Sequence, residues 1–89
     1  MSIEIEEKID ALKALLLRKN AAYGDFYKQP GILSYSSPED RMSSRIDEKL
    51  ARLKNLWGGT GERGEALEDT CMDLAGCFVL MTILLEAAE

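Results

Sequence analysis

The C-terminal quarter of the chain constrains the fold most strongly, because it contains a long apolar run. Residues 74–85 read LAGCFVLMTILL, 12 positions that are apolar almost all the way round a helix. Such a helix needs neighbours on several sides, whereas an ordinary surface helix is apolar on one face only. The run is shorter than the roughly 20 residues that a helix needs to cross a bilayer. We therefore expect core or a subunit interface here, and no membrane partner.

Acidic residues occupy the turns that precede this run. Glu65, Asp69 and Asp73 recur every four residues, so on a helix they form one carboxylate stripe, and Glu68 lies beside it. The sequence predicts a single long helix at about residues 63–88. Its first half is expected to border a polar site.

Composition places the chain among small acidic globular proteins. Its 89 residues suffice for one domain, residues 1–89, and so short a chain often needs oligomerisation to bury enough apolar surface. The net charge of −5 argues against direct nucleic-acid binding and against a membrane surface, which both favour a basic excess. The acidic start of the chain shows no signal-peptide pattern, so we expect a cytoplasmic protein.

Two further helices are expected before the C-terminal one. The first covers about residues 3–22, with Ser2 as N-cap, Gly24 as terminator and an apolar stripe through Ile5, Ile9, Leu12, Leu15 and Leu16. The second covers about 38–57, where Ser37 is the N-cap and Pro38 the first helical residue. Its predicted core stripe is Met42, Ile46, Leu50, Leu53 and Trp57.

The connection at 23–37 is the longest segment without periodicity. It contains the aromatic residues Tyr23, Phe26, Tyr27 and Tyr35. Unstructured loops of more than about 12 residues are uncommon in small domains and are often functional. The aromatic side chains either plug the end of the helical bundle or stack on a nucleobase, and the sequence leaves both alternatives open.

A basic stripe follows the outer face of the second helix. It consists of Arg41, Arg45 and Arg52 with Glu48 among them, and Lys49 flanks it. The short link GGTGERG makes the second and third helices antiparallel neighbours, which brings this stripe towards the acidic one. The two stripes form either a seam of exposed salt bridges, worth about 0–1 kcal/mol per pair, or a site for an anionic ligand.

Three segments of the chain resemble a small helical phage family described as nucleotide-modification-associated. They are KNAAYGD at 19–25, RIDEKLARL at 45–53 and EDTxxDLAG at 68–76, and the resemblance covers about residues 16–85. The arrangement is also similar to the all-α nucleotide pyrophosphatases of the MazG-like group. Those enzymes hold Mg²⁺ with an EExxE motif on one helix and an ExxD motif on the next, and the ions bridge phosphates and activate water.

The match to these enzyme motifs is partial. Glu48 corresponds to the first acid of the first motif, but Lys49 and Arg52 stand where further acids are expected. Asp73 corresponds to the aspartate of the second motif, and its partner position is Thr70. Lysine and arginine neutralise a phosphate directly, but they do not activate water as a metal ion does. The resemblance therefore favours nucleotide binding over nucleotide cleavage.

The sequence thus predicts an all-α, MazG-like fold: a three-helix chain with an antiparallel helix pair that completes a bundle by forming a dimer or tetramer through residues 74–85. The expected function is sequestration of a nucleotide or nucleotide-derived signal without turnover. A Mg²⁺-dependent nucleotide pyrophosphohydrolase and an interaction module without a ligand remain as alternatives. The expected nucleotide-binding residues are Lys19, Tyr23, Tyr27, Arg41, Arg45, Lys49 and Arg52. The candidate metal ligands, should a Mg²⁺ ion bind, are Glu48, Glu68, Asp69 and Asp73.

Overall fold

The computed structural model describes residues 2–33, 36–58 and 64–88. Within these ranges the chain forms three α-helices and one short 3₁₀ helix, with no strand. The elements are α1 (Ile3–Tyr23), η1 (Phe26–Lys28), α2 (Pro38–Gly58) and α3 (Gly64–Ala87). The all-α prediction is confirmed. The connection predicted at 23–37 begins one residue later than expected and includes η1, while the predicted start of the third helix at residue 63 lies outside the described residues.

The helix ends follow from capping residues in the sequence. Asp40 donates its backbone N–H to Ser37 Oγ at 3.1 Å, so the predicted N-cap of α2 is confirmed. Gly24 ends α1 in the left-handed region at φ +57°, and its N–H donates to the carbonyl of Asn20 at 2.7 Å. Ser2 lies at the N-cap position of α1, but its side chain makes no capping hydrogen bond.

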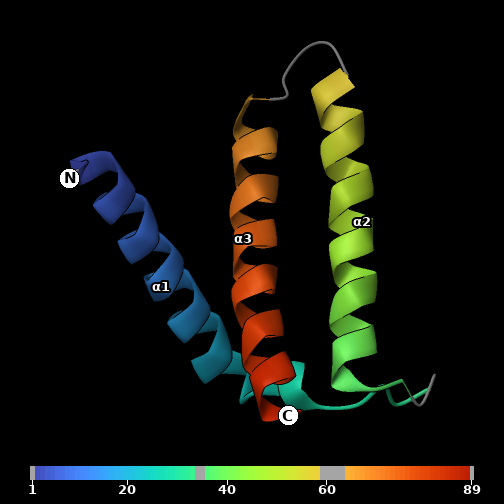
Figure 1. Cartoon of the computed structure of the whole chain (residues 1–89). Coiled ribbons are helices and arrows are strands. Elements are labelled where there is room, and N and C mark those ends of the chain that lie inside the picture. Colours follow the sequence, from blue (N-terminus) through green and yellow to red (C-terminus); the bar gives the residue numbers. More distant parts are fainter. Residues whose placement is uncertain (1, 34–35, 59–63, 89) are drawn as a thin grey trace.

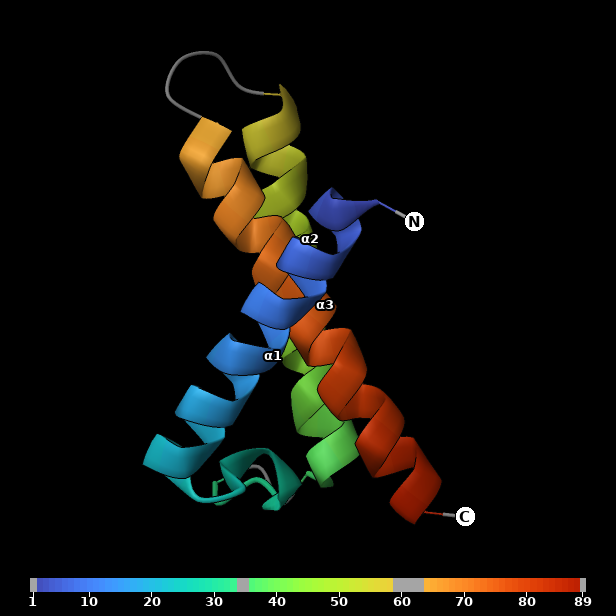
Figure 2. The same ribbon diagram turned by 90° about the vertical axis from the view of Figure 1, so that its left-hand side faces the viewer.

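Helices α2 and α3 lie side by side and antiparallel, as the short link between them predicts (Figure 1). Helix α1 crosses α3 obliquely in the perpendicular view (Figure 2). At the crossing, a Cβ atom on Gly76 would lie 3.1 Å from Leu16 Cδ2 and 3.7 Å from Leu12 Cδ1. Glycine at this buried position therefore permits the close approach of α1 and α3.

The hydrophobic core lies between α2 and α3 and is small. Met42, Cys77 and Leu84 are buried in one cluster. The half-buried side chains that pack against it are Tyr27, Ile46, Leu80 and Met81. Both cysteines are free; Cys77 is buried in this core, whereas Cys71 is exposed.

The buried stripe of α2 differs from the predicted one. Leu50 and Trp57 were expected in the core, but they are 44% and 69% exposed. The side chains that turn inward after Ile46 are Lys49, Leu53 and Leu56. This spacing of alternating three and four residues keeps one face of a helix against an antiparallel neighbour, as in a coiled coil. Because the prediction considered only apolar residues, it assigned Leu50 to the inward face in place of Lys49.

The first half of α1 also departs from the expected packing. Ile5 and Ile9 were predicted to be buried, but they are 58% and 59% exposed. Helix α1 contacts α3 where it crosses it, near Leu12 and Leu16, and its N-terminal turns lean away from α3 (Figure 1). A crossing helix buries only the turns near the crossing point, so the apolar stripe continues onto exposed surface.

Helix α3 matches the predicted long helix, but its apolar segment extends beyond the run at 74–85. Residues Ala66–Ala87 are long and apolar enough to cross a membrane, judged by length and composition, and 28% of the most apolar window is buried inside the structure. The core helix of a soluble protein meets the same criterion, so this finding is weak support for a membrane. With 22 residues, however, this apolar segment is long enough to span a bilayer, so the length argument against a membrane does not apply to it.

Candidate functional site

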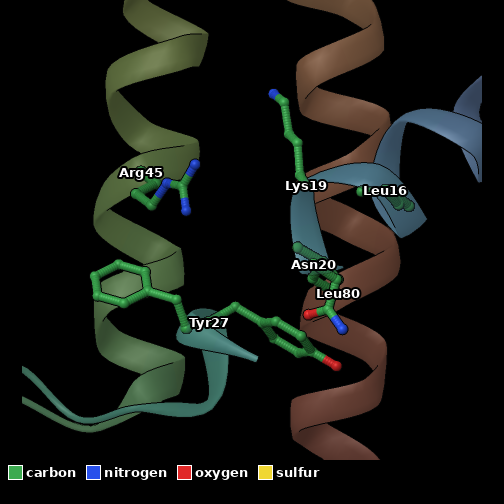
Figure 3. Close-up of a pocket in the computed structure, with 7 residues that line it drawn as sticks. Leu16, Lys19, Asn20, Tyr27, Arg45 and Leu80 are labelled. Atoms are coloured by element: carbon green, nitrogen blue, oxygen red, sulfur yellow. The ribbon is translucent and has the colours of Figure 1, made fainter. Parts of the chain in front are cut away.

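A cavity of about 510 Å³ opens where the end of α1 and η1 meet the α2–α3 pair. Its lining residues are Leu16, Lys19, Asn20, Phe26, Tyr27, Arg45 and Leu80. The walls are mainly apolar, with two cationic groups and one amide among them. Figure 3 shows Arg45 extending from α2 into the space between the helices, with Tyr27 across its lower end. The size is typical of a site for a small molecule.

A second hollow of about 50 Å³ continues the cavity towards the middle of α3. The two hollows share Lys19 and Arg45 among their lining residues, and the second adds Lys49 and Asp73. The combined site therefore has an aromatic end formed by η1 and a cationic end formed by α1 and α2. Three of the predicted nucleotide-binding residues, Lys19, Arg45 and Lys49, meet at the cationic end.

Asp73 holds the two lysines of the cationic end. Lys49 Nζ lies 3.4 Å from Asp73 Oδ2, and Lys19 Nζ lies 3.9 Å from Asp73 Oδ1. Each oxygen of one carboxylate thus faces a cation from a different helix. The Lys49 and Asp73 side chains are 25% and 32% exposed, so this pair is screened from water more than an ordinary surface salt bridge.

Arg45 lies at the junction of the two hollows. Among the described residues, no acid lies within ion-pair distance of its guanidinium group. A guanidinium group can donate two parallel hydrogen bonds to a phosphate, so Arg45 is the cation best suited to an incoming anion.

Phe26 and Tyr27 form the aromatic end of the cavity. Tyr27 is half-buried and packs against the core cluster, and it also lines the cavity. Phe26 is 46% exposed on the cavity wall, with the Arg41 guanidinium 4.6 Å from its ring centroid. These two rings close the end of the bundle and present aromatic surface to the cavity, whereas stacking on a base stays a prediction. The Tyr23 side chain and Tyr35 lie outside the described residues.

Arg41 has a different environment from the other predicted phosphate ligands. Its Nη1 donates to the carbonyl oxygens of Gln29 at 2.8 Å and Pro30 at 3.1 Å. Through these hydrogen bonds Arg41 holds the connection that carries Phe26 and Tyr27 against α2. Arg41 lines neither hollow. Arg52 is exposed and also lines neither hollow. The structure therefore does not bring these two arginines to the cavity.

The acids suggested as metal ligands are dispersed. Glu48, Glu68 and Asp69 are exposed, and Asp73 is paired with lysines. Within residues 2–33, 36–58 and 64–88, no three or more His, Cys, Asp or Glu side chains gather closely enough to hold a metal ion. Thr70 is buried, and its hydroxyl donates to the Ala66 carbonyl at 2.8 Å. This donor set does not fit the Mg²⁺ cage that the resemblance implies.

The salt-bridge seam expected between α2 and α3 is also not formed along the described parts of these helices, where the one ion pair joins Lys49 to Asp73. Sequence reasoning did not select three cavity residues, Leu16, Asn20 and Leu80. Asn20 directly follows Lys19 on the last turns of α1, and that position beside a candidate cation was the available signal.

Comparison of the chain with protein-family models, with curated proteins and with solved structures finds no match. The resemblance to the nucleotide-modification-associated and MazG-like families therefore stays a prediction. The functional argument depends on the geometry of the cavity.

Proposed function

We propose that this protein binds a nucleotide in the cavity between α1, η1 and the α2–α3 pair, and does not turn it over. The observation that carries the proposal is the convergence of Lys19, Arg45 and Lys49 next to the aromatic surface of Phe26 and Tyr27. A nucleotide has the same two parts, an anionic phosphate and a flat aromatic base.

The charge of the cavity supports an anionic ligand. The chain has a net charge of −5, so a cationic patch runs against its overall balance. Among the described residues, three cations and one acid line the two adjoining hollows, which gives a local charge of about +2. A phosphate that accepts hydrogen bonds from Arg45 and the lysines would form charge-assisted contacts, the stronger kind in proteins.

The apolar part of the cavity supports a ring-shaped ligand body. A nucleobase against Phe26 or Tyr27 would gain about 1–3 kcal/mol from stacking. Leu16 and Leu80 provide apolar contacts on the opposite elements, and the Asn20 amide can donate to or accept from a base edge. An inorganic anion would use only the cationic end.

Binding without turnover is favoured by the arrangement of the acids. Hydrolysis of a phosphoanhydride in the MazG-like enzymes uses Mg²⁺ to activate water. Among the described residues that line the two hollows, the one acid is Asp73, which already faces two lysines, and Glu48, Glu68 and Asp69 are exposed. The pyrophosphohydrolase alternative remains a prediction that the experiment below also tests.

Isothermal titration calorimetry against nucleoside mono-, di- and triphosphates, cyclic nucleotides and inorganic phosphate tests this proposal. We expect saturable binding of at least one nucleotide, weaker binding of inorganic phosphate, and no release of pyrophosphate when Mg²⁺ is added. Absence of binding across the panel would favour an interaction module without a ligand. Release of pyrophosphate that a chelator abolishes would favour the enzyme.

We further propose that the chain acts as a homo-oligomer, a dimer or tetramer, through the exposed side of α3. Phe78, Val79, Ile83 and Leu85 are 38–52% exposed there. The accessible surface is 6873 Å², whereas about 5200 Å² is expected for a compact monomer of this mass. The radius of gyration is 14.7 Å against about 12 Å expected.

Because of this excess of exposed surface, we infer that a second copy of the chain covers the exposed side of α3. The excess amounts to about 1700 Å² per chain, or about 3400 Å² for two chains, within the roughly 2000–5000 Å² in total that obligate homodimer interfaces bury. A second copy would also cover the exposed isoleucines at the start of α1. We place the oligomer in the cytoplasm, that of the infected host if the chain is encoded by a phage, and a membrane is the alternative outcome.

A further inference from the structure

The charges lining the cationic end can be counted, and the count restricts the ligand. Among the described lining residues, Lys19, Arg45 and Lys49 contribute three positive charges, and Asp73 contributes one negative charge. The site therefore has about two positive charges to offer an incoming anion. A nucleoside monophosphate carries about two negative charges near neutral pH, because its second phosphate pKa is about 6.

Asp73 determines this balance because it lies among the cations. Its carboxylate is within 3.4 Å of Lys49 Nζ and 3.9 Å of Lys19 Nζ, so a bound phosphate and the Asp73 carboxylate would contact the same lysines. Each phosphate beyond the first adds about one negative charge, which would repel the Asp73 carboxylate. The hollow beside Asp73 measures about 50 Å³, which leaves little room for a chain of phosphates.

The larger hollow has the complementary property. At about 510 Å³ and with mainly apolar walls it suits a nucleoside, the part of the ligand without charge. The order of the two hollows then gives the ligand a direction. A base would lie at the η1 end against Phe26 or Tyr27, and a phosphate would lie between Arg45 and the lysines.

From these observations we infer that the cavity selects a nucleoside monophosphate over di- and triphosphates, and that Asp73 sets this selection by neutralising one of the three cations. The inference depends on the proposed function, since it names the ligand class for the same cavity. Asp73 acts here as a specificity-determining residue that holds the lysines and repels additional phosphates.

Calorimetry with a ladder of ligands that share one base tests the inference. The ladder consists of the 3′,5′-cyclic monophosphate, the 5′-monophosphate, the diphosphate and the triphosphate. The buffer contains a metal chelator, so that no divalent metal ion neutralises the phosphate charges. The wild-type protein is expected to bind the 5′-monophosphate most tightly. In Asp73→Asn, the affinity for the triphosphate relative to the monophosphate should rise about three- to tenfold, because one repulsive charge is removed.

Asp47→Asn is the matched control. It changes the net charge of the chain equally, but Asp47 is exposed on α2 and lines neither hollow. The affinities of Asp47→Asn for the four ligands should equal those of the wild type. A purely structural role of Asp73 would lower the affinity for all ligands in proportion and leave the ratios unchanged.

The outcomes separate the inference from the proposed function. If the wild type binds none of the ligands, the proposed function fails. If the wild type binds more tightly with each added phosphate, or if Asp73→Asn leaves the ratios unchanged, the inference fails and nucleotide binding stands.

Discussion

Lys49 Nζ lies 3.4 Å from Asp73 Oδ2, which joins α2 to α3 at the cationic end of the cavity. Lys19 of α1 approaches the other oxygen of the same carboxylate at 3.9 Å. Asp73 thus contacts cations from both other helices. The site exists only when α1, α2 and α3 are all in place, so changes that move α1 should affect binding without unfolding the α2–α3 pair.

Gly76 controls the distance between α1 and α3. Gly76→Leu should displace α1 from the crossing, because even a Cβ there would lie 3.1 Å from Leu16 Cδ2. We expect nucleotide affinity to fall by at least tenfold with most of the helix content retained, as measured by calorimetry and circular dichroism.

Gly76→Ala is the control for this prediction. Leu16 is half-buried beside the cavity, so its side chain can yield by a few tenths of an ångström. Alanine also gains up to about 1 kcal/mol of helix propensity. Stability should be unchanged or raised, and a large loss for Gly76→Ala would contradict this account of the crossing.

Gly24 is required by the backbone that ends α1. Its φ of +57° lies in the left-handed region, so Gly24→Ala should lower the free energy of unfolding by about 1 kcal/mol in urea denaturation. Gly58→Ala is the matched control, because its Cβ would meet no atom within 4 Å and its φ is not positive. Equal effects of the two changes would show that conformation at Gly24 is not the cause.

Arg41 should act on stability and loop position, and not as a phosphate ligand. Arg41→Gln removes the charged donor to Gln29 and Pro30 and the contact over Phe26, and we expect a loss of about 1 kcal/mol of stability. Nucleotide affinity should fall a few-fold, and its dependence on salt should stay unchanged. A flatter salt dependence would instead identify Arg41 as a cation that contacts the phosphate.

The exposed side of α3 should mediate self-association. Phe78→Lys places a charge on the apolar surface, so sedimentation velocity should show a shift from oligomer to monomer. Leu33→Lys is the control, since Leu33 is 94% exposed in the connection before α2 and lies outside α3. A wild-type protein that sediments as a monomer, or that partitions into lipid vesicles, would contradict the proposed oligomer.

Local signals in the sequence were sufficient for the helices. Ser37 and Gly24 carry capping chemistry that is readable from the residue types, so the start of α2 and the end of α1 lie within a residue of their predicted limits. The inward face of α2 was less accessible to sequence reasoning. Lys49 occupies an inward position because its amine reaches Asp73, and a polar residue there interrupts the apolar pattern that guided the prediction.

The candidate site was predictable in part. Lys19, Arg45, Lys49 and Tyr27 were selected, and they meet at the cavity. Arg41 and Arg52 were selected by the same charge pattern but do not line the cavity. The periodicity of α2 does not reveal which of its turns lie opposite α1 and η1. The crossing of α1 over α3 at Gly76 is a tertiary feature, and it decides which cations can converge.

The most direct test compares two arginines of α2 that the sequence treated alike. Both are exposed, but Arg45 lines both hollows and Arg52 lines neither. In calorimetry with a nucleoside monophosphate, Arg45→Glu should weaken binding by about tenfold or more, since a charge-assisted contact is worth about 1.5–3 kcal/mol. Arg52→Glu should bind within about twofold of the wild type, which corresponds to less than half a kcal/mol. Equal losses in the two variants, or no binding by the wild-type protein, would contradict a nucleotide site in this cavity.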